Sequence, residues 1–145
     1  MKEMQIVLMI DDNPADTDLV AEALRDCIGS SLSSVGDGEA AIAFLKRRGI
    51  HAQEARPDLI ILDLNLPKKS GHTVLAELKA DPDLKAIPVV VFSTSRLNSD
   101  IASSYELGAN SYVNKPGNLT EFLAAVRAIE GFWFKTSSLP RGGKR

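Results

Sequence analysis

The sequence predicts an α/β protein built on a doubly wound, five-stranded parallel sheet. Five strand-like segments alternate with five segments of helical periodicity, which is the pattern of a parallel sheet with helices on both faces. Several of the strands are uninterrupted aliphatic runs, as expected of strands that are buried on both sides. The chain of 145 residues is long enough to bury one substantial core, so we expect a single domain.

Each predicted strand ends at a polar or turn-forming residue. We expect the strands at Gln5–Ile10, Leu32–Val35, Asp58–Asp63, Ile87–Phe92 and Ser111–Asn114. The third strand contains four consecutive aliphatic residues before the carboxylate of Asp63, and Pro67 soon prevents any regular continuation.

Capping residues mark the helices between these strands. Asn13 is a candidate cap and Pro14 suits the first turn of the first helix, whose inward residues extend through Cys27 and Ile28 to Gly29. The other helices are expected at Ala40–Lys46, from Ser70-Gly71 to near Asp81-Pro82, at Ser99–Leu107, and from Asn118 through Ile129. Residues 48–57 are predicted to form a polar loop.

The composition argues against several functional classes. The net charge is -2 and the body of the chain has no basic patch, so we expect no nucleic-acid partner. No apolar run approaches the roughly 18 residues of a membrane span, and no targeting segment is visible, so we expect a cytoplasmic protein without membrane contact. The single cysteine, Cys27, excludes an internal disulfide and is predicted to be a small buried hydrophobic residue.

Polar side chains gather where the predicted strands end. Asp11 and Asp12 follow the first strand, Asp63 ends the third, Ser93 follows the fourth and Lys115 follows the fifth. The ends of parallel strands share one edge of a doubly wound sheet, and in the common order 2-1-3-4-5 these four strands are neighbours. We therefore expect the five side chains to meet in one crevice.

The chemistry of this crevice suits phosphoryl transfer. Three close carboxylates repel one another unless a cation neutralises them, and oxygen ligands without nearby histidine or cysteine favour Mg²⁺ or Mn²⁺. Lys115 offers a fixed positive charge and Ser93 a hydroxyl donor to the oxygens of a phosphoryl group. Asp63 is central among them, which makes it the best candidate nucleophile for an aspartyl-phosphate.

These motifs resemble the receiver domain of bacterial two-component response regulators. The resemblance extends from about Gln5 to Ile129 and rests on Asp11-Asp12, Asp63-Leu64-Asn65-Leu66-Pro67, Ser93 and Tyr112-Val113-Asn114-Lys115-Pro116. It implies a flavodoxin-like (βα)5 fold and a receiver domain at residues 1–131. It also implies a signalling protein rather than an enzyme, whose only catalysis is its own phosphorylation and autodephosphorylation.

The resemblance further implies a metal site. Asp63 would be the phosphoacceptor and a ligand of Mg²⁺, Asp12 a direct ligand, and Asp11 a ligand through bound water. Asn65 would supply its backbone carbonyl. Mn²⁺ and Ca²⁺ are the expected substitutes for Mg²⁺.

The remaining matched residues imply a switch. Lys115 would bind the phosphoryl group, Ser93 would be the switch hydroxyl and Tyr112 the switch aromatic, which turns inward when Ser93 moves. The affected surface would lie around the fourth helix, the fifth strand and the last helix. Asn65 and Ser95, two residues past the phosphoacceptor and switch positions, are expected to tune the lifetime of the phosphorylated state.

Three segments are similar to the stand-alone regulators of bacterial phytochromes. They are Asp-Asn-Pro-Ala-Asp at 12–16, Gly-Ala-Asn-Ser-Tyr-Val-Asn-Lys-Pro at 108–116 and Phe-Trp-Phe at 132–134. This similarity implies a sensor histidine kinase as the partner, specifically a bacterial phytochrome.

The last residues are predicted to form an aromatic segment and a basic tail at 132–145, with no output domain. Trp133 continues the inward stripe of the last helix, whereas Phe132 and Phe134 are predicted to point elsewhere. Exposed aromatics often mark interfaces, so we expect a homodimer that uses the last helix and Phe132, Trp133 and Phe134. The alternative is a segment that folds back over its own core.

Other functions stay open at this point. A Mg²⁺-dependent phosphohydrolase-like enzyme would need a second acid two residues past its nucleophile, where this chain has Asn65. A nucleotide- or flavin-binding module would need a glycine-rich loop after the first strand, where acidic residues stand instead. An adaptor with an inactive site is disfavoured by the intact constellation. His51 and His72 are predicted to be surface residues without a chemical role.

Overall fold

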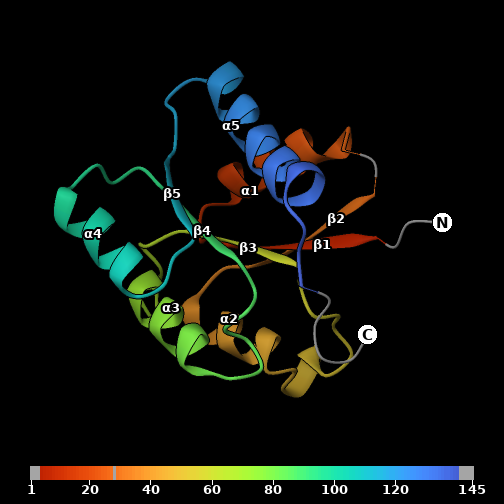
Figure 1. Cartoon of the computed structure of the whole chain (residues 1–145), viewed down its shortest axis with the longest axis vertical. Coiled ribbons are helices and arrows are strands. Elements are labelled where there is room, and N and C mark those ends of the chain that lie inside the picture. Colours follow the sequence, from red (N-terminus) through yellow and green to blue (C-terminus); the bar gives the residue numbers. More distant parts are fainter. Residues whose placement is uncertain (1–3, 28, 141–145) are drawn as a thin grey trace.

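The computed structural model describes residues 4–27 and 29–140, and it contains the predicted parallel sheet (Figure 1). The strands are β1 (Gln5–Ile10), β2 (Ser30–Val35), β3 (Leu59–Leu62), β4 (Val89–Ser93) and β5 (Ser111–Asn114), and their order in the sheet is β2-β1-β3-β4-β5. The helices are α1 (Pro14–Arg25), α2 (Gly38–Leu45), α3 (Gly71–Ala80), α4 (Asn98–Glu106) and α5 (Leu119–Gly131). A 3₁₀ turn, η1 (Gly49–His51), follows α2, and a π-helical turn, η2 (Phe132–Thr136), follows α5.

The alternation of side chains along the strands divides the core into two layers. In β1, Val7 and Met9 pack with α1 and α5, whereas Leu8 and Ile10 pack with α2 and α3. The same alternation continues in β3 and β4, because these central strands are buried on both faces. Helices α1 and α5 thus cover one face of the sheet, and α2, α3 and α4 lie on the other side (Figure 1).

The helix boundaries follow their caps more closely than their hydrophobic periodicity. The Asn13 side chain accepts hydrogen bonds from the backbone N–H groups of Ala15 and Asp16, and Pro14 occupies the first turn, as predicted. The expected extension of α1 to Gly29 is wrong, because the helix ends at Arg25. Cys27 therefore lies in the following turn and is only half-buried; Ile28 lies outside the described residues.

Both histidines lie at the surface only in part, because each is half-buried against a neighbouring element. His51 belongs to η1, inside the segment expected to be a loop, and its ring lies 5.3 Å from the ring of Phe44. His72 bonds through Nε2 to the Ser104 hydroxyl at 3.1 Å, which joins α3 to α4. Neither contact could be read from local sequence, because each depends on how a helix packs against its neighbour.

The segment after α5 differs from the prediction at one aromatic residue. Phe134 is buried in the core layer of α1 and α5, so the prediction that it points away from the core is wrong. Trp133 is half-buried against the same layer, and Phe132 is half-exposed. The cause is η2, in which the N–H of Ser137 donates to the carbonyl of Phe132, five residues back. The predicted basic tail at 141–145 lies outside the described residues.

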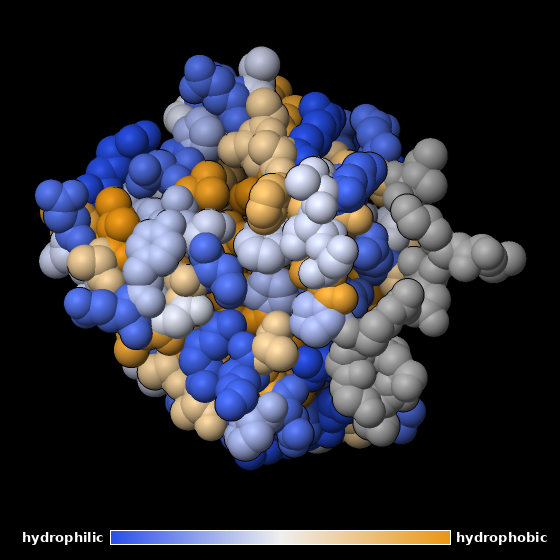
Figure 2. Space-filling view, in the orientation of Figure 1, coloured by the Kyte–Doolittle hydropathy of each residue, from blue (hydrophilic) through white to orange (hydrophobic). Residues whose placement is uncertain are grey.

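The visible surface mixes hydrophilic and hydrophobic residues, which occur singly or in small groups on the face in Figure 2. Among the described residues, no helix has the length and apolar character that crossing a membrane requires.

Candidate functional site

The sheet itself positions the polar side chains at its carboxyl edge. One ladder hydrogen bond continues past the end of each of β1, β3 and β5. The N–H groups of Asp11, Asp63 and Lys115 donate to the carbonyls of Val35, Ile10 and Ser93, at 3.1, 2.9 and 2.8 Å. Ile10 pairs with Leu62 across β1 and β3, so Asp11 and Asp63 follow as the next neighbours. The sheet therefore fixes the backbone positions of Asp11, Asp63 and Lys115.

Strand alternation sends the side chains to two different faces. Val113 packs in the layer of α1 and α5, and two residues later Lys115 extends on the same side. Its ammonium lies 5.9 Å from the centre of the buried Phe92 ring. Tyr112, one residue before Val113, packs in the opposite layer, with α3 and the chain around α4. Lys115 and the acids that it contacts, which we call the acid–lysine group, thus lie on the face of the sheet opposite Tyr112, the predicted switch aromatic.

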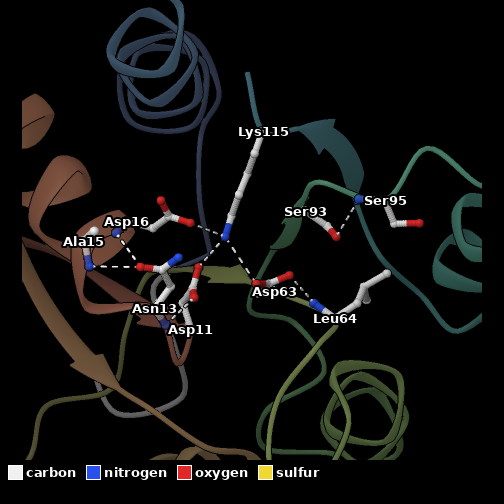
Figure 3. Close-up of polar contacts among 9 residues, drawn as sticks. All are labelled: Asp11, Asn13, Ala15, Asp16, Asp63, Leu64, Ser93, Ser95 and Lys115. Carbon is white, nitrogen blue, oxygen red and sulfur yellow. Dashed lines mark hydrogen bonds and ion pairs between the residues drawn. The ribbon is translucent and has the colours of Figure 1, made fainter. Parts of the chain in front are cut away.

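Lys115 is the centre of the acid–lysine group (Figure 3). Its Nζ atom donates to Oδ2 of Asp11 at 2.7 Å, to Oδ2 of Asp16 at 2.8 Å and to Oδ2 of Asp63 at 3.2 Å. An ammonium has three N–H donors, so each donor has one carboxylate. The lysine side chain is only 4% exposed, which keeps these bonds away from competing water.

Burial and charge shift the pKa values of this group in ways that follow from its geometry. Burial alone would lower the pKa of Lys115, but its hydrogen bonds to Asp11 and Asp16 and the charge of Asp63 outweigh that effect and raise the pKa. Burial raises the pKa of Asp11, against the hydrogen bond from Lys115. The lysine is therefore a permanent cation, while the acids around it remain incompletely neutralised.

The acids also form a group that fits a divalent cation. One carboxylate oxygen each of Asp11, Asp12 and Asp63 lies within 4.8 Å of the others. Asp12 is exposed and has no hydrogen bond or ion pair within the described residues, so its oxygens are free to bind an ion. Carboxylate oxygens are the ligands that Mg²⁺ and Mn²⁺ prefer, and the acids outnumber the lysine. The residues present thus fit the metal that the sequence predicts.

The loop after β3 is held close to the predicted nucleophile. The N–H of Leu64 donates to Oδ1 of Asp63 at 2.7 Å, which leaves the carboxylate with one oxygen toward Lys115. A Cβ atom on Gly71 would lie 2.3 Å from the carbonyl oxygen of Asp63, so only glycine allows α3 to begin here. Asn65, whose backbone carbonyl is the predicted metal ligand, is exposed in this loop.

The predicted switch residues are joined to each other through Ser95. Ser93 is fully buried, and its hydroxyl accepts a hydrogen bond from the N–H of Ser95 at 3.2 Å. The carbonyl of Ser95 accepts from the Tyr112 hydroxyl at 2.8 Å and from Asn114 Nδ2 at 2.9 Å. Tyr112 is half-buried, so in this structure its hydroxyl already contacts the loop that Ser93 begins.

The structure brings together Asp11, Asp12, Asp63 and Lys115 as the sequence predicts, with Ser93 on the other side of Asp63 in the view of Figure 3. The residue that sequence reasoning missed is Asp16. In the sequence it stands as the last residue of the Asp-Asn-Pro-Ala-Asp motif, in the first turn of the helix that Asn13 and Pro14 begin. Its contact with Lys115 depends on the direction of α1, which local sequence does not specify.

Known proteins share this architecture. The family model for the response regulator receiver domain matches residues 7–127. The chain is 47% identical over 137 residues to Response regulator Rcp1 of Synechocystis sp. The matched region covers 94% of this chain and 93% of that protein. The phosphorylated cyanobacterial phytochrome response regulator RcpA is similar in structure, with a TM-score of 0.92, 47% identity, and 94% of this chain and 99% of that chain covered. The Mn²⁺-bound form of Rcp1 gives a TM-score of 0.89 at the same identity and coverage.

Proposed function

The chain belongs to the response regulator receiver family, and from this premise we propose that it is a phosphorylation switch with Asp63 as the phosphoacceptor. The observation that carries the proposal is the position of the Asp63 carboxylate, which accepts from Lys115 at 3.2 Å and lies in one oxygen cluster with Asp11 and Asp12. A carboxylate that attacks phosphorus needs a nearby positive charge and a site for a divalent cation. Asp63 has both around it.

The reaction assigns a role to each residue of the acid–lysine group. An oxygen of Asp63 bonds to phosphorus while the phosphorus–nitrogen bond of a phosphohistidine breaks, and the electron pair remains on the imidazole nitrogen, which takes up a proton. Lys115 donates to a phosphoryl oxygen. Asp11, Asp12, Asp63 and the Asn65 carbonyl would hold Mg²⁺, with Mn²⁺ or Ca²⁺ as substitutes. When bound, the ion supplies the positive charge that balances the carboxylates and the phosphoryl oxygens.

The switch follows from the hydrogen bonds of Ser93. A phosphoryl group on Asp63 offers new acceptor oxygens, so the Ser93 hydroxyl turns toward them and gives up the N–H of Ser95. The Ser95 carbonyl is also the acceptor of Tyr112, so this movement changes the surface formed by α4, β5 and α5. Asn65 and Ser95 are the positions proposed to set the lifetime of the phosphorylated state.

The phosphoryl donor that we propose is a sensor histidine kinase of the bacterial phytochrome type. Support comes from the relatives, since RcpA is described as a cyanobacterial phytochrome response regulator. A phosphohydrolase-like enzyme stays less suitable, because the residue two positions past Asp63 is Asn65, an amide that cannot act as a general acid.

We also propose that two copies associate through α5 and the aromatic residues that follow it. Phe132 is 51% exposed and packs edge-on against Trp133 at 5.0 Å, so these two residues remain available to a partner. Phe134 is buried in its own core, so its part in the interface is indirect: it holds the turn that presents the other two. Sedimentation equilibrium at micromolar concentrations should find a dimer that Phe132→Ala weakens, and a monomer at all concentrations would contradict the proposal.

The phosphoacceptor is tested with acetyl phosphate in the presence of Mg²⁺. We expect labelling of the wild-type chain that EDTA prevents and that Asp63→Asn abolishes. Asp58→Asn is the matched control, because Asp58 directly precedes β3, at the end of the strand opposite Asp63, and its carboxylate accepts from the N–H of Ile6. Equal labelling of Asp63→Asn and the wild type would exclude Asp63.

A further inference from the structure

We propose that Asp16 is a positioning residue for phosphoryl transfer, which keeps the Lys115 ammonium in place when a cation occupies the neighbouring carboxylates. This inference rests on the proposed function and extends it to a residue that neither the metal site nor the phosphoacceptor requires.

The three carboxylates around Lys115 are not equivalent. Asp11 and Asp63 also belong to the oxygen cluster that fits a divalent cation. Asp16 does not belong to that cluster, although its Oδ2 lies 2.8 Å from the lysine nitrogen. Asp16 is therefore the one partner of Lys115, within the described residues, whose charge is not shared with the metal site.

This difference matters once the site is loaded. A divalent cation that binds Asp11 and Asp63 neutralises part of their negative charge, so their attraction to the Lys115 ammonium weakens. The cation itself also repels the ammonium. The phosphoryl group then occupies the oxygen of Asp63 that Lys115 now contacts. Asp16 is the only one of the three acids that keeps its bond to the ammonium through both changes, so it fixes the position from which Lys115 reaches a phosphoryl oxygen.

The backbone holds Asp16 suitably for this role. Its N–H donates to the Asn13 side chain at 3.2 Å, which fixes the first turn of α1. Its carboxylate side chain is 20% exposed and reaches a lysine 99 residues later in the chain. An acid in the first turn also favours a helix through the helix dipole, but that effect is local and does not involve Lys115. The two roles can therefore be separated by what a variant does to the lysine.

The variants differ in charge and reach. Asp16→Asn keeps an oxygen acceptor at the same place and removes the charge, so Lys115 should be held in the metal-free protein and released when Mg²⁺ binds. Asp16→Glu keeps the charge and should restore most of the function. Glu22→Gln is the matched control, because it removes an acid from an exposed position of the same helix.

The first measurement requires no phosphoryl transfer. The method is NMR of protein labelled with ¹⁵N-lysine, in which the signal of the Lys115 ammonium reports how fast its protons exchange with water. In the wild type and in Glu22→Gln this exchange should be slow, both with and without Mg²⁺. In Asp16→Asn the signal should broaden into fast exchange when Mg²⁺ is added. A signal that survives Mg²⁺ in Asp16→Asn would overturn the proposal.

The second measurement follows labelling by acetyl phosphate at increasing Mg²⁺. Asp16→Asn should lower the rate at saturating Mg²⁺ by about tenfold, because the lysine is misplaced, while the Mg²⁺ concentration for half-maximal labelling changes little. A changed Mg²⁺ requirement with an unchanged maximal rate would make Asp16 a metal ligand instead and overturn the assignment. In a Lys115→Met background, Asp16→Asn should have no further effect, and this comparison remains valid if Asp16→Asn lowers stability.

The two proposals fail in different ways. If Asp63 is not the phosphoacceptor, Asp63→Asn remains labelled, while the Lys115 signal still reports on Asp16. If only the inference on Asp16 is wrong, labelling requires Asp63 but is indifferent to Asp16→Asn.

Discussion

Within the described residues, two groups that combine a lysine with a buried acid differ in charge balance. At the end of α5, the side chain of Glu130 is 4% exposed and accepts from Lys135 at 2.9 and 3.0 Å and from the Ser30 hydroxyl at 3.0 Å. One acid there faces one base. At the carboxyl edge of the sheet, Lys115 faces three acids, and Asp12 stands beside them.

The difference in balance separates a structural contact from a site prepared for a ligand. The Glu130 group needs nothing further, because a paired and hydrogen-bonded charge is tolerated inside a protein. The Lys115 group is left with a surplus of negative charge, and burial holds the pKa of Asp11 above its usual value. An added cation removes this surplus. The same types of residue therefore form a structural contact at Glu130 and a site that can bind a ligand at Lys115.

The largest loss of stability should come from the core beside the Glu130–Lys135 pair, which we call the balanced group. Phe134→Ala removes a buried ring next to α5, and such truncations typically cost about 3–5 kcal/mol of unfolding free energy. Phe132→Ala, two residues away and half-exposed, is the control and should cost far less in the monomer. Urea unfolding at a concentration where the chain is monomeric measures both. Equal losses would show that η2 does not anchor the segment as described.

Mg²⁺ should stabilise the region with surplus charge and leave the balanced one untouched. At about 100 times its dissociation constant, an ion that binds only the folded state adds about 2.7 kcal/mol to the unfolding free energy. Asp12→Asn should remove most of this gain, whereas Glu130→Gln should keep it in full. Thermal unfolding with and without Mg²⁺ gives the comparison. A gain that depends on Glu130 would place the ion elsewhere.

Removing the lysine of the balanced group should destabilise the fold. Lys135→Met leaves the buried carboxylate of Glu130 with the Ser30 hydroxyl and the Cys27 thiol as partners. Because the Lys135 side chain is 58% exposed, solvent screens the pair, and the cost at neutral pH should be about 1 kcal/mol. The hydrogen bond from Lys135 to Glu130 raises the pKa of the lysine. The contribution of the pair is therefore fully present below the ordinary lysine pKa of 10.5 and disappears as the pH rises through the higher folded value. Unfolding free energies at pH 7 and under strongly alkaline conditions should converge for the two proteins; a constant difference would assign the loss to packing.

The smallest effect has the opposite sign. In metal-free buffer, Asp12→Asn removes one of several mutually repelling charges and should raise the unfolding free energy by about 0.5 kcal/mol. The exposed control Glu22→Gln should show no such gain, since Glu22 pairs with Arg25. Chemical unfolding in EDTA resolves the two, and a loss of stability in Asp12→Asn would mean that this carboxylate has a favourable partner.

The sequence was sufficient for the sheet and for most of its edge. Long aliphatic runs that end in Asp11 and Asp63 indicate central parallel strands, and parallel strands bring their ends together whatever the helices do. The positions of Ser93 and Lys115 follow from the same rule. Backbone geometry alone therefore predicts the neighbours of Asp63.

Features that depend on helix direction or pitch cannot be predicted from the local sequence. Asp16 reaches Lys115 only because the first turn of α1 lies beside the end of β5, and His72 meets Ser104 only because α3 and α4 touch. Phe134 lies in the core, against the prediction, because the period of 3.6 residues does not continue past Gly131, where the chain forms the wider turn of η2. The lack of room for a Cβ atom on Gly71 beside Asp63 is likewise visible only in three dimensions.

The π-helical turn makes the number of residues after α5 as important as their identity. Deleting one residue between Phe132 and Thr136 would let an ordinary helical turn form and rotate everything beyond it by roughly 100°. A different aromatic would then enter the core, and Lys135 would leave Glu130. Homologues with the same aromatic residues but a one-residue insertion or deletion here should therefore present a different surface to their partners. Alignment gaps at this point would distinguish those proteins from this one better than sequence identity does.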